Sequence, residues 1–107
     1  MKLEKSHIIE EFLKDTSSIL GKKLIEKYLF GSYALNTQTA LSDIDILFIV
    51  DTLNLNTQSQ LSDLASEYSL NHDVCISPIL TDKKIWEKNK QFNTLFYQEI
   101  YRNGIRL

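Results

Sequence analysis

Apolar and polar side chains alternate most strictly between Asp43 and Val50. Successive side chains of a β-strand point to opposite faces, so this alternation predicts a strand with one apolar face. The residues of that face are Ile44, Ile46, Phe48 and Val50. Asp43 and Asp45 belong to the opposite face, which places two carboxylates side by side, with their Cα atoms roughly 6.6 Å apart.

Helical spacing is clearest from Thr57 to Leu70, where apolar residues recur at positions i, i+3, i+4 and i+7. These residues are Leu61, Leu64, Ala65 and Tyr68. The pattern predicts a helix whose apolar stripe covers the sheet. Near the N-terminus, Ser6 is a suitable cap for a first helix that runs to about Leu13 or Ser18.

Two more strands are expected, over Leu24 to Phe30 and over His72 to Leu80. Gly31 ends the first of them, and Ser32 to Asn36 has the composition of a short helix. Pro78 lacks an amide proton, so it indicates an edge position or a bulge in the later strand.

The C-terminal third predicts two helices. Thr81 is expected to cap the first, which holds Ile85 and Trp86, and Gly104 is expected to end the second. The apolar stripe of the second consists of Phe92, Leu95, Phe96 and Ile100. Helices and strands alternate along the chain, which predicts an α/β domain with a small mixed sheet flanked by helices.

Length and composition limit the class of protein. With 107 residues, 43% of them hydrophobic and 24% charged, residues 1–107 are expected to form a single globular domain. The net charge of −2 argues against direct binding of nucleic acid, which needs a basic surface. The charged start of the chain does not resemble a signal peptide, and the longest apolar run, Ile46 to Val50, is too short for a membrane span. We therefore expect a cytoplasmic protein.

Charge is unevenly distributed. No lysine or arginine occurs between Tyr28 and Asp82, whereas residues 81–107 carry a net charge of +3, from six basic and three acidic side chains.

Cys75 is the only cysteine, which excludes an internal disulfide, and it is expected to be a small buried strand residue.

The segment Gly31-Ser32 precedes the Asp43-Ile44-Asp45 segment by ten residues. Glycine lets a phosphate approach the backbone, and the Ser32 hydroxyl and nearby amides can donate hydrogen bonds to it. Paired carboxylates suit magnesium, which relieves their mutual repulsion. The Asp-x-Asp pattern alone is more often only a polar strand face, but the two segments together predict a site for a nucleoside triphosphate.

These segments resemble both halves of the signature of the minimal nucleotidyltransferases of the DNA polymerase beta superfamily. Asn71 to Ile76 is similar to the strand that carries the family's third carboxylate, here Asp73, and Phe96 to Leu107 is similar to its closing helix. The resemblance implies that Asp43, Asp45 and Asp73 are catalytic and hold two magnesium ions. It also implies that Gly31 and Ser32 bind the phosphates of ATP.

The same resemblance implies the transfer of a nucleoside monophosphate, AMP from ATP, to a hydroxyl acceptor. A tyrosine of a partner toxin with a HEPN domain is the expected acceptor, and the chain is expected to act as the antitoxin or to form a homo-oligomer. Leu35 and Asn36 replace the family's usual basic residue and glycine. An antitoxin that binds without catalysis therefore stays open as an alternative, as does, less favoured, a nucleotidyltransferase for small molecules such as antibiotics.

Three further features have two interpretations each. The acidic site lacks positive charge, which is expected to come from Lys83, Lys84 or Lys88, or else from a partner. Tyr33 either stacks on a base or packs under its loop. Tyr97 and Tyr101, four residues apart, form either an exposed aromatic patch or half-buried packing.

Overall fold

The computed structural model describes residues 6–107. The charged residues Lys2, Glu4 and Lys5, which argue against a signal peptide, lie outside that range. The helices are α1 (Ser6–Leu20), the short 3-10 helix η1 (Gly21–Lys23), α2 (Ser32–Leu35), α3 (Leu55–His72), α4 (Lys83–Gln91) and α5 (Leu95–Asn103). The strands are β1 (Leu24–Phe30), β2 (Ile44–Val50), β3 (Ile76–Asp82) and β4 (Ile105–Arg106).

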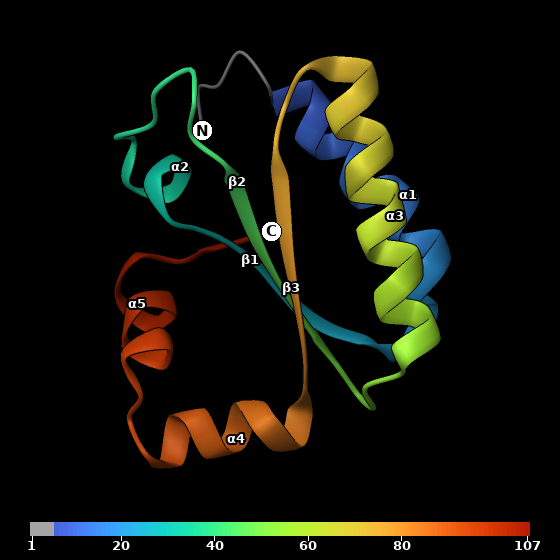
Figure 1. Ribbon diagram of the computed structural model, residues 1–107. Coiled ribbons are helices and arrows are strands. Elements are labelled where there is room, and N and C mark those ends of the chain that lie inside the picture. Colours follow the sequence, from blue (N-terminus) through green and yellow to red (C-terminus); the bar gives the residue numbers. More distant parts are fainter. Residues whose placement is uncertain (1–5) are drawn as a thin grey trace.

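The strands form one four-stranded sheet in the order β3-β2-β1-β4 (Figure 1). β1 is antiparallel to both β2 and β4, whereas β3 is parallel to β2, to which α3 connects it. The sheet is therefore mixed, as the sequence predicted. In its register Asp45 lies between Phe30 of β1 and Ser77 of β3, so the end of β1 and the start of β3 flank the acidic strand.

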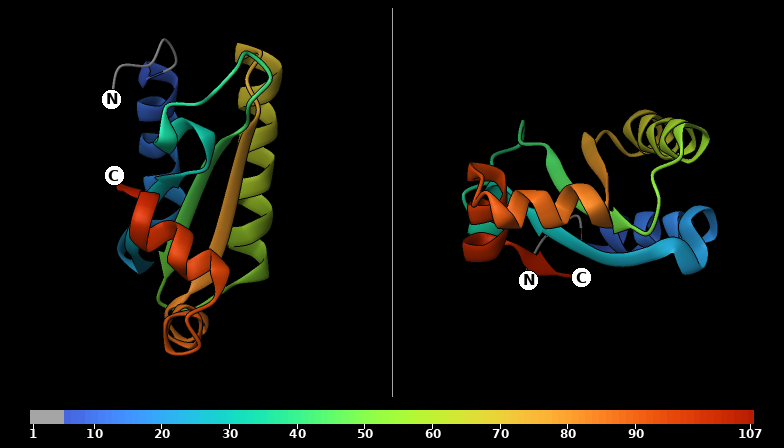
Figure 2. Two further views of the ribbon diagram at one scale, coloured as in Figure 1. Left: turned by 90° about the vertical axis from the view of Figure 1, so that its left-hand side faces the viewer. Right: turned by 90° about the horizontal axis from the view of Figure 1, so that it is seen from below.

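Helices cover both faces of the sheet (Figure 2). On one face α1 and α3 pack on the predicted apolar residues of β2, and the Phe12 ring lies 6.4 Å from Phe48 and 5.3 Å from Tyr68. On the other face α5 packs on Leu47 and Ile49, which are also buried. β2 is therefore buried on both faces, as is typical of a central strand.

The boundary of β3 differs from the prediction. α3 continues to His72, and Asp73 takes the left-handed conformation with φ 53° at the end of that helix, so the strand begins at Ile76 and not at His72. Aspartate tolerates this conformation better than most residues, which makes it a suitable end for a helix. β3 forms one edge of the sheet, which confirms the edge position that Pro78 indicated.

The predicted cap of α4 was wrong. Thr81 is buried within β3, and the Asp82 carboxylate instead accepts a hydrogen bond of 2.7 Å from the Ile85 amide. Phe92, assigned to the apolar stripe of the last helix, precedes α5 and is 71% exposed. Gly104 does end α5, since its backbone is extended with ψ 137°, and a Cβ there would lie 2.6 Å from the Ile100 carbonyl oxygen, which favours glycine.

Among residues 6–107, no helix combines the length and hydropathy that a bilayer crossing requires.

Replacing Phe48 by alanine removes a side chain that is 0% exposed and contacts Phe12. We expect Phe48→Ala to lower the free energy of unfolding by about 3–5 kcal/mol, as measured by urea denaturation. Phe92→Ala is the control, with an expected change within about 0.5 kcal/mol because that ring is exposed. Equal losses in the two variants would contradict the burial of Phe48 between the helices and the sheet.

Candidate active site

Two carboxylates mark the start of β2. Asp43 immediately precedes the strand and is exposed, whereas Asp45 lies within it and is partly buried. Both alternate with the residues that face α1 and α3, so they share the face of Leu47 and Ile49, as predicted. Asp43 is thus open to solvent, and Asp45 is accessible in part.

The environment of Asp45 opposes its ionisation. Burial raises the pKa of the Asp45 carboxyl above its ordinary value, and the negative charge of Asp43 raises this pKa further. A cation bound between the two groups would favour their charged forms. The site therefore has the electrostatics of an acid pair that gains stability when it binds a metal ion.

Gly31 lies directly against the Asp45 carboxylate. Its backbone has φ 73° and ψ −153°, a combination available almost only to glycine. A Cβ at this position would overlap the carboxylate of Asp45. The first half of the predicted signature is thus in contact with the second, because Phe30 pairs with Asp45 across β1 and β2.

The turn after Gly31 is tight. The amides of Ala34 and Leu35 both donate to the Gly31 carbonyl oxygen, at 3.1 and 3.2 Å. The first turn of a helix leaves its leading amides without an intrahelical acceptor, so those of Ser32 and Tyr33 are the donors that α2 offers to an anion. α2 has only four residues, so we assign the contribution to these amides and not to a helix dipole.

Asn36 ends this turn in the left-handed conformation, with φ 59°, and its amide donates to the Ser32 carbonyl oxygen. Asparagine adopts this conformation more readily than most residues, so the turn is kept although Asn36 replaces a glycine. Tyr33 is 5% exposed and belongs to the core, so it packs under the loop and does not stack on a base. Leu35 is 48% exposed and contributes no charge.

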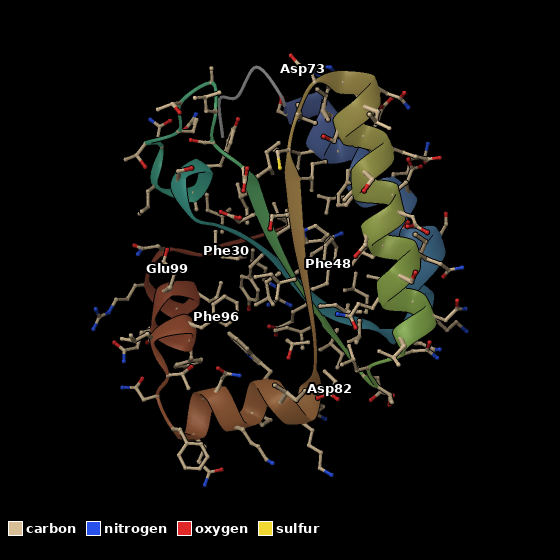
Figure 3. The ribbon with its side chains drawn as sticks, in the orientation of Figure 1. Phe30, Phe48, Asp73, Asp82, Phe96 and Glu99 are labelled. Atoms are coloured by element: carbon tan, nitrogen blue, oxygen red, sulfur yellow. The ribbon has the colours of Figure 1, made fainter. Side chains whose placement is uncertain are left out.

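Asp73 does not occupy the predicted strand. It lies at the exposed end of α3, before β3 begins (Figure 3). Strand alternation therefore does not place it on one sheet face with Cys75 and Ser77. Among the described residues, no three histidine, cysteine, aspartate or glutamate side chains are arranged to hold a metal ion.

Cys75 is the residue that contacts Asp43 from the neighbouring chain segment. The hydrogen bond between the two side chains raises the pKa of the Cys75 thiol, and burial and the negative charges of Asp43 and Asp45 raise this pKa further. The Cys75 carbonyl oxygen also accepts a hydrogen bond of 2.8 Å from the Ile44 amide. Cys75 is exposed, so the expectation of a buried residue was wrong.

The pair Asp43 and Asp45 fits a magnesium ion without a third protein ligand. Magnesium commonly takes one or two carboxylates and completes its coordination with substrate phosphates and water. The turn at Gly31, the predicted phosphate-binding segment, lies against Asp45. The residues present therefore fit a metal that binds together with a nucleotide.

The lysines of α4 do not compensate the acidic site. α4 follows Asp82, which pairs with Val50 at the opposite end of β2 (Figure 1). Val50 lies five residues beyond Asp45 along the strand, a distance of roughly 16 Å. Lys83, Lys84 and Lys88 are thus at the far end of the sheet, and the expectation that one of them serves the site was wrong.

Aromatic contacts hold α5 against β1 beside the site. The Phe96 ring lies 5.5 Å from Phe30 and 5.9 Å from Trp86 (Figure 3). Tyr97 is half-buried and stacks at 5.9 Å on Tyr101, which is 77% exposed. Of the two alternatives that the sequence left open, Tyr97 shows the half-buried packing and Tyr101 the exposed aromatic surface.

A cavity of about 340 Å³ adjoins Asp43 on its other side, between α3 and β3. The sequence did not reveal it, because its polar lining belongs to the outer face of a predicted helix. The residues lining this cavity, called here the α3–β3 groove, are Asp43, Ser62, Ala65, Ser66, Ser69, Cys75, Ile76, Ser77 and Pro78.

A mixed sheet in which a Gly-Ser turn contacts an Asp-x-Asp strand defines a nucleotidyltransferase-like domain. The family model described as "Polymerase beta, Nucleotidyltransferase" matches residues 8–107. The chain belongs to this family, which confirms the resemblance, the fold and the nucleotidyltransferase class.

Similar proteins point to one activity within the family. A Methanocaldococcus jannaschii protein with the provisional name protein adenylyltransferase MJ0141 is 38% identical over 106 residues, covering 98% of this chain and 100% of the relative. A toxin–antitoxin crystal structure with AMP-PNP has a TM-score of 0.60 and 26% identity, covering 91% of this chain and 70% of that chain. A complex of a tri-AMPylated Shewanella oneidensis HEPN toxin with an MNT antitoxin has a TM-score of 0.51 and 26% identity, covering 94% of this chain and 66% of that chain.

The contact of Gly31 with Asp45 predicts a larger effect for Gly31→Ala than for Gly21→Ala. Gly21 has φ 54°, but a Cβ there would meet no atom within 4 Å, so only backbone strain of about 1–2 kcal/mol is expected. At Gly31 the backbone conformation is available almost only to glycine, and the Asp45 carboxylate would also have to shift, so together these effects are expected to add about 1–3 kcal/mol. Chemical denaturation measures the loss in free energy of unfolding for each variant. Equal losses in the two variants would contradict the contact of Gly31 with Asp45.

The raised pKa of Asp45 predicts a dependence of stability on pH. A carboxyl whose pKa is higher in the folded state stabilises the fold when protonated, and this contribution is lost as the pH rises through that pKa. We therefore expect Asp45→Asn to be more stable than the parent protein at pH 7 without metal, and the difference to shrink as the pH falls toward 3.8. Urea denaturation at both pH values measures the difference in free energy of unfolding between the variant and the parent protein. A lower stability of the variant at pH 7 would contradict the raised pKa of Asp45.

Proposed function

We propose that this chain transfers AMP from ATP to a hydroxyl group of a partner protein. The observation that carries the proposal is the contact of Gly31 with Asp45, which joins phosphate donors and metal ligands in one site. The provisional name of the M. jannaschii relative supports AMP transfer to protein. The AMPylated toxin in the S. oneidensis complex supports a toxin with a HEPN domain as the acceptor.

The proposed roles follow from the position of each residue. Asp43 and Asp45 hold magnesium, and the backbone at Gly31 together with the Ser32 amide and hydroxyl binds the distal phosphates of ATP. The metal supplies positive charge at the phosphates, which the chain itself lacks between Tyr28 and Asp82. The family resemblance assigned a third role to Asp73, which lies at the exposed end of α3, and this assignment stays a prediction.

The chain's own groups orient the triphosphate. Amides at the start of α2 would bind the distal phosphates beside the carboxylates at the start of β2. Because Asp45 is partly buried, its interaction with a cation is stronger than in bulk water. The AMP-PNP in the similar toxin–antitoxin structure supports ATP as the nucleotide.

A binding-only antitoxin is the second candidate. Its supporting observation is Leu35, an exposed apolar side chain where the family usually has a basic one. Under either proposal the partner is a protein, the complex acts in the cytoplasm, and direct binding of nucleic acid is not required. Transfer to a small molecule such as an antibiotic, or action as a homo-oligomer, has no supporting contact among the described residues.

The proposal is tested by incubating the protein, magnesium and ATP labelled at the α-phosphate with a lysate of its source cells. We expect label on a discrete protein, and a loss of at least about 100-fold in the Asp43→Asn/Asp45→Asn variant, since removal of metal ligands abolishes charge stabilisation. Asp51→Asn, at the other end of β2, is the matched control and is expected to label normally. Omission of magnesium is expected to match the double variant.

Other outcomes separate the alternatives. Label on a small molecule would favour the antibiotic-type enzyme. A partner that co-purifies while no aspartate-dependent label forms would identify the chain as a binding-only antitoxin and would overturn the proposed transfer.

A further inference from the structure

A larger cavity lies on the sheet face that α4 and α5 cover (Figure 1). It has a volume of about 420 Å³ and is called here the α4–α5 cavity. Its floor includes Tyr28 of β1, Ile49 of β2 and Arg106 of β4. Ile49 lies four residues beyond Asp45 along β2, a distance of roughly 13 Å. Neither Asp43 nor Asp45 lines this cavity, which is therefore separate from the proposed active site.

Aromatic rings from both helices form one wall of the α4–α5 cavity. The Tyr97 ring lies 5.6 Å from Trp86 and stacks on Tyr101 at 5.9 Å, with an angle of 26° between the two ring planes. Tyr101 is 77% exposed, and Trp86 and Tyr97 are exposed in part. Planar rings such as nucleobases stack on aromatic side chains of this kind. The wall therefore offers a stacking surface to a planar ligand.

Positive charge surrounds these rings. The charged residues that line the cavity are Lys83, Lys90, Arg106, Glu26 and Glu87, which gives a net charge of +1. Arg106 lies 3.9 Å from Glu26, and this is the ion pair within 4 Å that the described part of the chain contains. The two lysines of α4 thus contact no carboxylate at that distance. Lysine ammonium groups in this situation are suited to bind a phosphate.

One of the two carboxylates already has a partner. The Tyr28 hydroxyl donates a hydrogen bond of 2.6 Å to Glu26, which also faces Arg106. Glu87 lies on α4 between the two lysines and can accept hydrogen bonds from ligand hydroxyls such as those of ribose. The lining therefore combines a stacking surface, an anion-binding part and a hydroxyl acceptor.

This combination indicates a class of ligand. A ring without charge would leave the lysines unused, and a phosphate without a ring would leave the aromatic wall exposed. A triphosphate carries more negative charge than a lining of net charge +1 can balance, so a monophosphate fits better. The volume also lies in the range of small-molecule sites, roughly 300–1,000 Å³.

We propose that the α4–α5 cavity binds a nucleoside monophosphate. The base stacks on Tyr97 and Tyr101 beside Trp86, and the phosphate pairs with the ammonium groups of α4. Binding needs no magnesium, because the lysines supply the positive charge that the chain lacks around Asp43 and Asp45. The proposal does not depend on AMP transfer, and it is testable without a partner protein.

Trp86 makes the test direct, because it is the only tryptophan of the chain and lines the cavity. Its fluorescence is followed while the full chain is titrated with AMP in the presence of EDTA, and calorimetry measures the same binding. Adenosine, which has the base but no phosphate, and ribose 5-phosphate, which has the phosphate but no base, are the comparison ligands.

Two double variants change the charge of α4 equally. Lys83→Gln/Lys90→Gln removes the lysines that line the cavity, and Lys84→Gln/Lys88→Gln is the matched control, because these two lysines do not line it. Tyr101→Ala removes an exposed ring, so the variant is expected to fold. Asp43→Asn/Asp45→Asn serves as the control for binding at the proposed active site.

We expect AMP to give a saturable change in fluorescence, with binding of adenosine and of ribose 5-phosphate at least about 10-fold weaker. Lys83→Gln/Lys90→Gln and Tyr101→Ala are each expected to raise the dissociation constant for AMP at least about 5-fold. Lys84→Gln/Lys88→Gln and the aspartate variant are expected to stay within about 2-fold of the parent value.

Three results would overturn the proposal. Absence of saturable AMP binding by both methods would refute the site. Equal weakening in the two lysine variants would reduce it to unspecific attraction by a basic helix. Loss of binding in the aspartate variant would assign AMP to the proposed active site. None of these results bears on AMP transfer, which the labelling experiment tests independently.

Discussion

The burial of β2 on both faces is the constraint on which the other parts of the structure depend. α1 and α3 cover one face of this strand and α5 covers the other, so apolar side chains fill every position from Ile46 to Val50. The charged residue of this strand is Asp45, the strand position that is not fully buried. The same packing that stabilises the domain thereby holds the Asp45 carboxylate in a partly buried position near the end of its central strand.

The local elements were predictable because their signals are local. β1 has the predicted bounds, β2 begins one residue after the predicted start, and the left-handed Asn36 follows from its residue type. The spacing of Gly31-Ser32 and Asp-x-Asp also identified the site, because an antiparallel pair of strands brings the end of β1 beside the start of β2.

The C-terminal side of the site was less predictable, because competing signals overlap there. The residues before β3 fit both an extending strand and a helix end, and only packing shows that α3 continues to His72. Asp73 takes the left-handed conformation before the strand begins. The alternation of side chains between the two faces of a strand therefore does not predict where its side chain points. The α3–β3 groove depends on how a helix sits over an edge strand, which no spacing in the sequence encodes.

The two edges of the sheet have a consequence for how this domain associates. At one edge Pro78 offers no amide proton, and at the other β4 is only two residues long. Exposed edges with free amides invite strand addition and cross-β aggregation, and short or proline-bearing edges discourage both. Continuation of the sheet into a neighbouring molecule is therefore disfavoured at both sides, and a domain of this kind would contact other proteins through its helices and side chains.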